Sequence, residues 1–300
     1  MSGWNRPLEG LNIDVSEHIH VLEYANSLEA WAKLNEIFLK LDKEVFNQGA
    51  IANSGVAAAY NMFIHIRNSW MDPEFNFGRM FNYTEAKWSS LLNNYIDFNK
   101  LDLMRSRLRV FQNKYNQNYN LTYTFNNHHD NGKQCLIAVT FSKRFQTPDP
   151  VVTVIMRASE ITKRLAFDLL LIQRIIEYVY GKGKTLPINI FASQMYGNIE
   201  TLIMYDTYKP LKKLLKKVDN PFTNKVKEVY NKFKQGEEKN FSSFKVFFRS
   251  FKVVRPDLYT YKPLYAKDLV LEFDDIDYPE DCITYRQRYQ YKKKYLQSKS

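Results

Sequence analysis

Residues 150–193, PVVTVIMRASEITKRLAFDLLLIQRIIEYVYGKGKTLPINIFAS, decide the fold class of this chain. Residues 150–156 are rich in β-branched side chains, which is typical of a strand. The apolar run 160–180 is long enough for a buried helix, and Gly181-Lys182-Gly183 ends it. A second strand is expected at 186–193. Strands that pack against a buried helix predict an α+β fold built of α/β layers.

Upstream of this stretch, the sequence predicts further helices and two more strands. Apolar residues recur there at three- and four-residue spacing, which is the helical period. The two shorter segments are rich in β-branched and aromatic residues, and Asn131-Gly132 between them is a strong turn signal. We expect helices at 16–47, 55–70, 84–95 and 101–111, and strands at 120–126 and 135–142. The third helix should begin with a capping box at Thr84.

The composition limits the class of protein. With 300 residues and 45% hydrophobic content the chain can build a sizeable core, and 43 Lys+Arg against 32 Asp+Glu leave a net charge of +11. This excess attracts nucleic acid, nucleotide phosphates or another anionic surface, or serves solubility alone. Two cysteines, Cys135 and Cys282, make no disulfide framework or zinc cluster. Without a signal-peptide-like start or 18 consecutive apolar residues, we expect a cytoplasmic protein with no membrane contact.

Positive charge is concentrated in the C-terminal third. Residues 209–255 contain 14 Lys or Arg and four acidic residues, with aromatic residues between them. An acidic stretch, 268–281, follows, and the chain ends on a basic, tyrosine-rich segment. We expect a core over 1–208 with a helical N-terminal region, a basic and aromatic extension over 209–283 packed on it, and a basic tail over 284–300 that is flexible until it binds.

Four segments in the middle of the chain have the order and spacing of a known family. FGRMFNYTEAKW (77–88) leads into a helix, and LTYTFNNHHDNGKQC (121–135) leads to a cysteine. RASEITKRLAFD (157–168) keeps an eleven-residue step from Arg to Asp, and SQMYGN (193–198) contains a tyrosine. In this order, over about residues 77–200, they resemble the thymidylate synthase superfamily, which includes the pyrimidine-nucleotide hydroxymethylases.

The resemblance implies a thymidylate-synthase-like mixed sheet packed against helices, with a pyrimidine-nucleotide site. Cys135 would be the nucleophile that attacks C6 of the base and activates C5. Arg157 and Ser159 would bind the phosphate and Tyr196 the ribose. Asp168 stands at the family's base-reading position, where a carboxylate implies cytosine rather than uracil. The resemblance further implies methylenetetrahydrofolate as one-carbon donor and a homodimer.

At several positions the sequence lacks groups that this chemistry needs. Gln194 stands in place of a histidine, and no glutamate stands where the folate-side general base is expected. The other replacements are Lys133-Gln134 for two prolines and Asn118-Tyr119 for two phosphate-binding arginines. Cys135 can equally be a buried inert thiol, and Asp168 a helical carboxylate paired with Arg164.

Two functions follow. The first is a protein that binds RNA or single-stranded DNA on a catalytically degenerate thymidylate-synthase-like scaffold. We expect it to be virus-encoded, to act in the host cytoplasm and to need no cofactor or metal. Cations would contact phosphates and exposed aromatic rings would stack on bases, unless those rings form a core. The expected contacts are Lys212, Lys213, Lys216, Lys217, Arg286, Arg288, Lys292, Lys293 and Lys294. The alternative is a hydroxymethylase or methyltransferase of dCMP, CMP or dUMP that uses Cys135.

Overall fold

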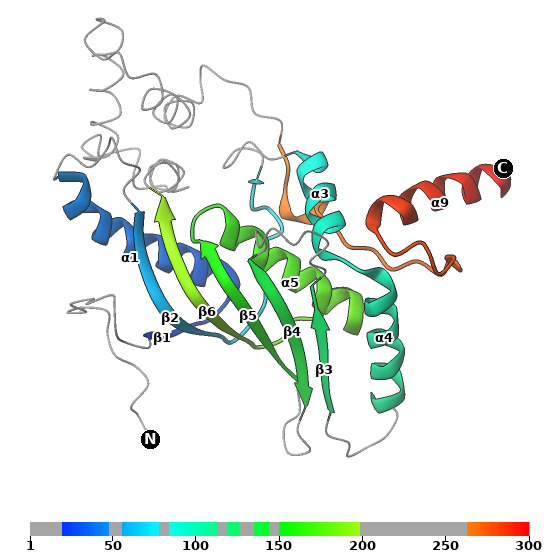
Figure 1. The fold of residues 1–300 in the computed structure, drawn as a ribbon, viewed down its shortest axis with the longest axis horizontal. Helices are drawn as coiled ribbons and strands as arrows, with labels where there is room; N and C mark the ends of the chain where they lie inside the picture. Colours follow the sequence, from blue (N-terminus) through cyan, green and yellow to red (C-terminus); the bar gives the residue numbers. More distant parts are fainter. Residues whose placement is uncertain are drawn as a thin grey trace, which may run out of the picture.

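A six-stranded mixed sheet forms the centre of the protein (Figure 1). The computed structural model describes residues 20–47, 56–77, 84–112, 119–125, 135–143, 150–198 and 263–299. Its strands are β1 (His20–Tyr24), β2 (Val56–Ile66), β3 (Tyr119–Thr124), β4 (Leu136–Lys143), β5 (Val151–Glu160) and β6 (Ile188–Asn198). Its helices are α1 (Ser27–Asn47), α3 (Glu85–Tyr95), α4 (Phe98–Gln112), α5 (Arg164–Tyr180) and α9 (Tyr285–Lys299), with a short 3-10 helix, η4, at Ala266–Asp268.

The strand order is β1-β2-β6-β5-β4-β3. The pairs β1/β2 and β5/β6 are parallel, and the other neighbours are antiparallel. Each parallel pair is joined through a helix, in the units β1–α1–β2 and β5–α5–β6, because parallel neighbours need a crossover connection. The predicted α+β class is confirmed by this architecture.

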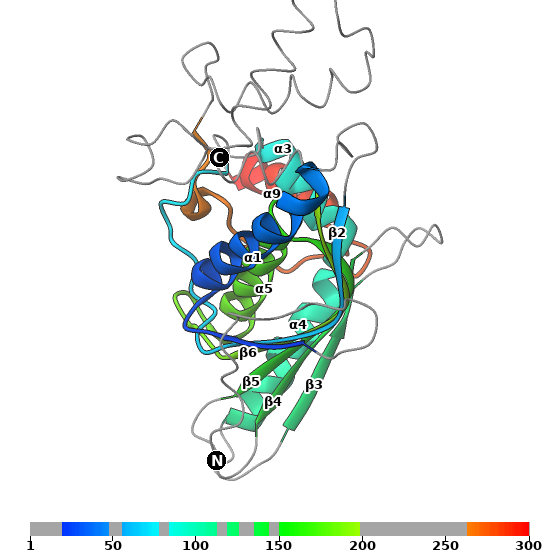
Figure 2. The same cartoon turned by 90° about the vertical axis from the view of Figure 1, so that its left-hand side faces the viewer.

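Helix α5 carries the centre of the core. Its residues Leu169, Leu170, Leu171 and Ile172 have no exposed surface, so the helix is apolar on nearly all sides. Helices α1 and α5 lie on the same face of the sheet (Figure 2). The sheet residues beneath them, such as Ile190 in β6, are equally buried. Burial of these side chains is the main driving force for the fold.

Two predictions for the N-terminal region were wrong. The helix expected at 16–47 begins only at Ser27, and strand β1 precedes it. The helix expected at 55–70 is strand β2, which is hydrogen-bonded on both edges. Its buried Met62, Ile64 and Ile66 follow the two-residue period of a strand. Pairing with both neighbours outweighs the helix preference of its alanines.

The remaining elements agree with the sequence apart from their ends. Helix α3 begins after Thr84, but the threonine side chain makes no capping hydrogen bond, so the capping box was wrongly predicted. Strand β5 continues to Glu160, where the sequence suggested the start of α5. The Glu160 carboxylate accepts hydrogen bonds from the backbone N–H groups of Thr162, Lys163 and Arg164, and so caps α5 from the end of the strand.

The C-terminal segment packs on the core where the structure describes it. Leu264 and Leu269 are buried, and Ala266 donates a backbone hydrogen bond to the carbonyl of Phe75. Arg174 of α5 donates to the carbonyl of Leu269 at 2.7 Å. The basic run 209–255 lies outside the described residues. The terminal segment, expected as a flexible tail, forms α9.

One face of the sheet is apolar and partly exposed. The registers place Val21, Phe63, Phe191 and Ile155 side by side across four strands. Val21, Phe191 and Ile155 are each 37–40% exposed. The homodimer that the resemblance implies stays a prediction.

None of the helices in the described ranges is long and apolar enough to cross a membrane.

Candidate functional site

The residues predicted from the resemblance lie at one end of the sheet, where β5 ends and α5 begins. Cys135 directly precedes β4, Arg157 and Ser159 belong to β5, Asp168 lies in the second turn of α5, and Tyr196 belongs to β6. The backbone N–H of Arg157 donates to the carbonyl of Cys135 at 2.8 Å, which joins the first two elements. Strand pairing places Glu160 beside Tyr196, so the four elements converge here.

Asp168 is a buried carboxyl group, with 3% of its surface exposed. Its Oδ2 accepts a hydrogen bond of 3.0 Å from the hydroxyl of Ser159, which has no exposed surface. Burial raises the pKa of Asp168 to about 7, although the Ser159 hydrogen bond and the charge of Arg164 oppose the shift. Near neutral pH this group is therefore present in both its acid and its carboxylate form.

Cys135 is half-buried and lies within electrostatic reach of this carboxyl group. Its carbonyl is hydrogen-bonded to Arg157, two residues before the Ser159 that contacts Asp168. Burial raises the pKa of its thiol, and the negative charge of Asp168 raises it further. The guanidinium groups of Arg164 and Arg157 act in the opposite direction. Because all three charges act on the thiol, its reactivity depends on whether Asp168 holds its proton.

Arg157 lies where the sheet is irregular. The register of β5 with β6 omits Arg157 and Ser193, and the register of β4 with β5 shifts between Leu136 and Ala138. Strand β2, on the other side of β6, is irregular at the same level of the sheet. Its Asn61 has a φ of 52°, and the register of β2 with β6 omits Asn61 and Ser193. Such bulges bend strands and redirect side chains next to functional sites. The Arg157 side chain is exposed, and its charge acts on the Cys135 thiol.

Three further residues belong to this cluster: Tyr95 and Glu160, which were not predicted, and Arg164, which the sequence suggested only as a partner of Asp168. Tyr95, at the end of α3, accepts a 3.2 Å hydrogen bond from the backbone N–H of Cys135 through its hydroxyl. Burial, with the charge of Asp168, raises the pKa of Tyr95 to about 12, so it stays neutral. Arg164 acts electrostatically on both Cys135 and Asp168, and Glu160 caps α5, the helix that carries Arg164 and Asp168. Glu160 and Arg164 could have been found from the sequence, because both lie in the short segment RASEITKR (157–164) with Arg157 and Ser159. No sequence signal points to Tyr95.

The described residues contain no group of three or more His, Cys, Asp or Glu that could hold a metal ion. No family model matches the chain, and no curated protein matches its sequence. The site must therefore be interpreted from its own geometry, which is a thiol, a buried carboxyl group and guanidinium groups at one end of the sheet.

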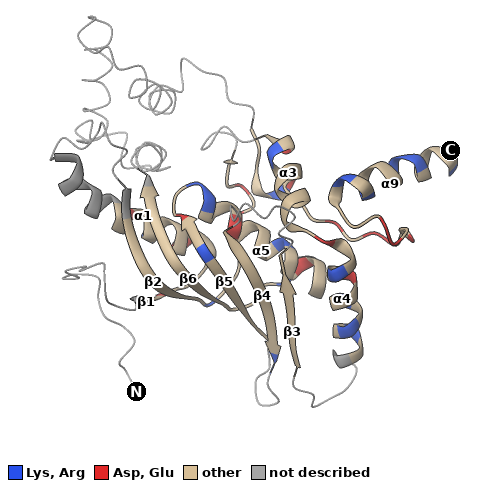
Figure 3. Cartoon of the chain, viewed as in Figure 1, with Lys and Arg blue, Asp and Glu red and all other residues tan. Residues whose placement is uncertain are grey.

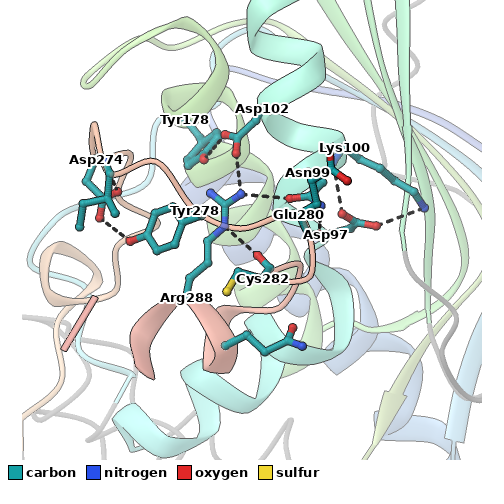
Figure 4. Close-up of polar contacts among 12 residues, drawn as sticks. Asp97, Asn99, Lys100, Asp102, Tyr178, Asp274, Tyr278, Glu280, Cys282 and Arg288 are labelled. Atoms are coloured by element: carbon teal, nitrogen blue, oxygen red, sulfur yellow. Dashed lines mark hydrogen bonds and ion pairs between the residues drawn. The ribbon is translucent and has the colours of Figure 1, made fainter. Parts of the chain in front are cut away.

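A second polar cluster fixes α9 to the body (Figure 4). Arg288 donates to Asp102 of α4 at 2.6 Å and to the carbonyl of Cys282 at 3.0 Å. Its guanidinium lies 4.6 Å from the ring centroids of both Phe98 and Tyr278. Tyr178 of α5 donates to the other oxygen of Asp102. This arginine therefore ties the C-terminal helix to α4 and, through Asp102, to the core helix.

Only part of the predicted nucleic-acid-binding set is available at the surface. Arg288 and Lys292 are paired with carboxylates of the same chain, Asp102 and Asp274. Three other members lie exposed on α9: Arg286, Lys293 and Lys294. The remaining four, Lys212, Lys213, Lys216 and Lys217, lie outside the described residues.

Replacing Arg288 should destabilise the protein. Arg288→Ala leaves the Asp102 carboxylate without its cation and removes two cation–π contacts, so we expect a loss of about 2–3 kcal/mol in the free energy of unfolding. The neighbouring Arg286→Ala, on the exposed side of α9, should change it by less than about 0.5 kcal/mol. Urea unfolding curves measure both. Equal small losses in the two variants would contradict the anchoring role.

Proposed function

We propose that the protein binds a cytosine nucleotide at the Cys135 end of the sheet, and that the Cys135 thiolate adds to C6 of the base. The observation that supports this best is a buried carboxyl group, Asp168, at the same end of the sheet as a half-buried thiol and close enough for its charge to act on that thiol. Even with the hydrogen bond that it accepts from Ser159, a carboxyl group costs more free energy to bury than an apolar side chain does. Such a group is typical of a binding site.

The protonation of Asp168 favours cytosine over uracil. The base edge of cytosine offers an acceptor at N3 and a donor at the 4-amino group, whereas uracil offers a donor at N3 and an acceptor at O4. A neutral carboxylic acid has one O–H donor and one carbonyl acceptor, which match cytosine. Because the pKa of Asp168 is raised to about 7, the neutral form is available at physiological pH.

Cys135 supplies the chemistry. Its thiolate forms a C–S bond to C6, and the C5–C6 electron pair makes C5 nucleophilic. C5 then takes a proton from water, the original C5 hydrogen leaves as a proton, and the C–S bond breaks to return the thiolate and the base. The net result is exchange of the C5 hydrogen with solvent, which needs no second substrate. Methylenetetrahydrofolate would be the co-substrate of a one-carbon transfer from the same adduct.

The cations near the thiol can bind the phosphate of the nucleotide and stabilise the thiolate. Arg157 is exposed, and its charge opposes the rise in the pKa of Cys135 that burial and Asp168 cause, so its guanidinium can hold a phosphate close to the nucleophile. Tyr196, which burial keeps neutral by raising its pKa, lies in β6 beside the end of β5 and can bind the ribose. These roles agree with the thymidylate synthase resemblance, in which the same positions hold phosphate and sugar.

Exchange of the C5 hydrogen tests this proposal. The native protein is incubated with dCMP, CMP or dUMP in ²H₂O, and the C5 proton signal is followed by NMR. We expect the signal of a cytosine nucleotide to decay faster than that of dUMP, and faster than without protein. If no nucleotide exchanges above background, with or without methylenetetrahydrofolate, the proposal is wrong.

A further inference from the structure

The C-terminal helix α9 carries a basic surface that is separate from the Cys135 site. The helix contains six cations and no acidic residue. One exposed side of the helix is formed by residues at helical spacing, namely Arg286, Tyr289, Gln290, Lys293, Lys294 and Gln297. We call these six residues the outer face of α9. At 1.5 Å per residue, they extend over about 16 Å of the helix.

The inner side of α9 is neutralised by the chain itself. Residues 272–281, the acidic strap, contain six acidic residues and run beside α9 (Figure 3). Lys292 pairs with Asp274 of the strap at 2.8 Å, and Tyr291 packs on Tyr278 with ring centroids 5.5 Å apart. None of the ion pairs among the described residues includes Arg286, Lys293 or Lys294. The positive charge is therefore directed outward.

Tyrosine rings are interleaved with these cations. Tyr289 is 61% exposed, and its ring stacks at 24° on that of Tyr285. A second pair, Tyr291 and Tyr295, stacks at 18°. Tyr289 of the first pair belongs to the outer face, so its ring can stack on an unpaired base. A duplex, whose bases are already stacked, cannot use this ring.

We infer that the outer face of α9 binds single-stranded nucleic acid, with Arg286, Lys293 and Lys294 on phosphates and Tyr289 stacked on a base. Arg288 fixes the first turns of α9 to α4 (Figure 4), and the rest of the helix projects from the body away from the sheet (Figure 1). The surface is independent of the proposed nucleotide site, because none of its residues belongs to the cluster around Cys135.

Fluorescence anisotropy with labelled 20-nucleotide oligo-dT, oligo-U and a duplex of equal length tests the inference. The native protein should bind both single strands more tightly than the duplex. The triple variant Arg286→Gln/Lys293→Gln/Lys294→Gln should raise the dissociation constant at least tenfold and lower the slope of log K against log salt by about 2. Tyr289→Ala should weaken single-strand binding and leave duplex binding unchanged.

The matched control removes the same charge elsewhere. Arg107, Arg109 and Lys182 are exposed on α4 and after α5, and their replacement by Gln should leave most of the affinity intact. Equal losses in the two triple variants would show that only net charge matters and would overturn the inference. Tighter binding of the duplex than of the single strands would also overturn it. Competition by polyglutamate as strong as that by oligo-dT would overturn it too, and would indicate that the surface binds an acidic protein.

Discussion

Cys135→Ala is expected to abolish exchange of the C5 hydrogen of a cytosine nucleotide. Without the thiolate no C–S bond forms at C6, so C5 never becomes nucleophilic. We expect the exchange rate, measured by NMR in ²H₂O, to fall by at least about 10³-fold, to the rate without protein. Nucleotide binding should persist, because the carboxyl group of Asp168 and the guanidinium of Arg157 remain.

The second cysteine of the chain is the natural control for this result. Cys282 is also buried, but it lies in the segment before α9, and its carbonyl accepts from Arg288. Cys282→Ala should therefore leave the exchange rate within about twofold of the native rate, since a backbone contact survives the substitution. If Cys135→Ala retained the exchange, or if Cys282→Ala abolished it, Cys135 would not be the nucleophile.

Asp168→Asn should change how the stability of the protein depends on pH. The pKa of Asp168 is raised to about 7 in the folded protein, from about 4 in an unfolded chain, so the folded state holds an extra proton between these values. The free energy of unfolding therefore falls as pH rises from about 4 to about 7, by up to about 1.4 kcal/mol per pH unit. Asparagine has no proton to lose, so the variant should lack this decline.

Urea unfolding of both proteins at pH 5, 6, 7 and 8 measures the effect. The variant should gain stability relative to the native protein as pH rises to about 7, and the difference should then level off. Asp277→Asn, at an exposed position of the acidic strap, should change the stability by less than about 0.5 kcal/mol. A constant difference between the Asp168 variant and the native protein at all four pH values would contradict a buried, proton-holding carboxyl group.

The sequence was sufficient to predict the centre of the fold. Helix α5 is long and apolar, Gly181 follows it, and the two flanking strands have the composition of buried strands. It was insufficient for β2, because the run of alanines at 57–59 has no clear period. The irregularity at Asn61 shifts the buried positions from Ala59 to Met62, Ile64 and Ile66, so the two-residue period covers only the second half of the strand.

For the site, residues close together in sequence could be predicted, whereas contacts between residues far apart in sequence could not. The eleven-residue step from Arg157 to Asp168 pointed to residues that lie near Cys135 in the structure. Tyr95 was missed, because its contact with Cys135 joins residues 40 apart in sequence. The role of Arg288 was missed for the same reason, since its partner Asp102 is 186 residues away. A basic side chain looks identical in sequence whether it faces solvent or anchors a helix.

Binding of dCMP and dUMP, measured by calorimetry at pH 6, tests the central claim most directly. At this pH Asp168 is mainly neutral, so the native protein should bind dCMP about 10- to 100-fold more tightly than dUMP, the usual discrimination of a two-hydrogen-bond base contact. In Asp168→Asn the amide matches uracil instead, so the preference should reverse. Equal affinities for the two nucleotides, unchanged by the substitution, would contradict a cytosine site at Asp168.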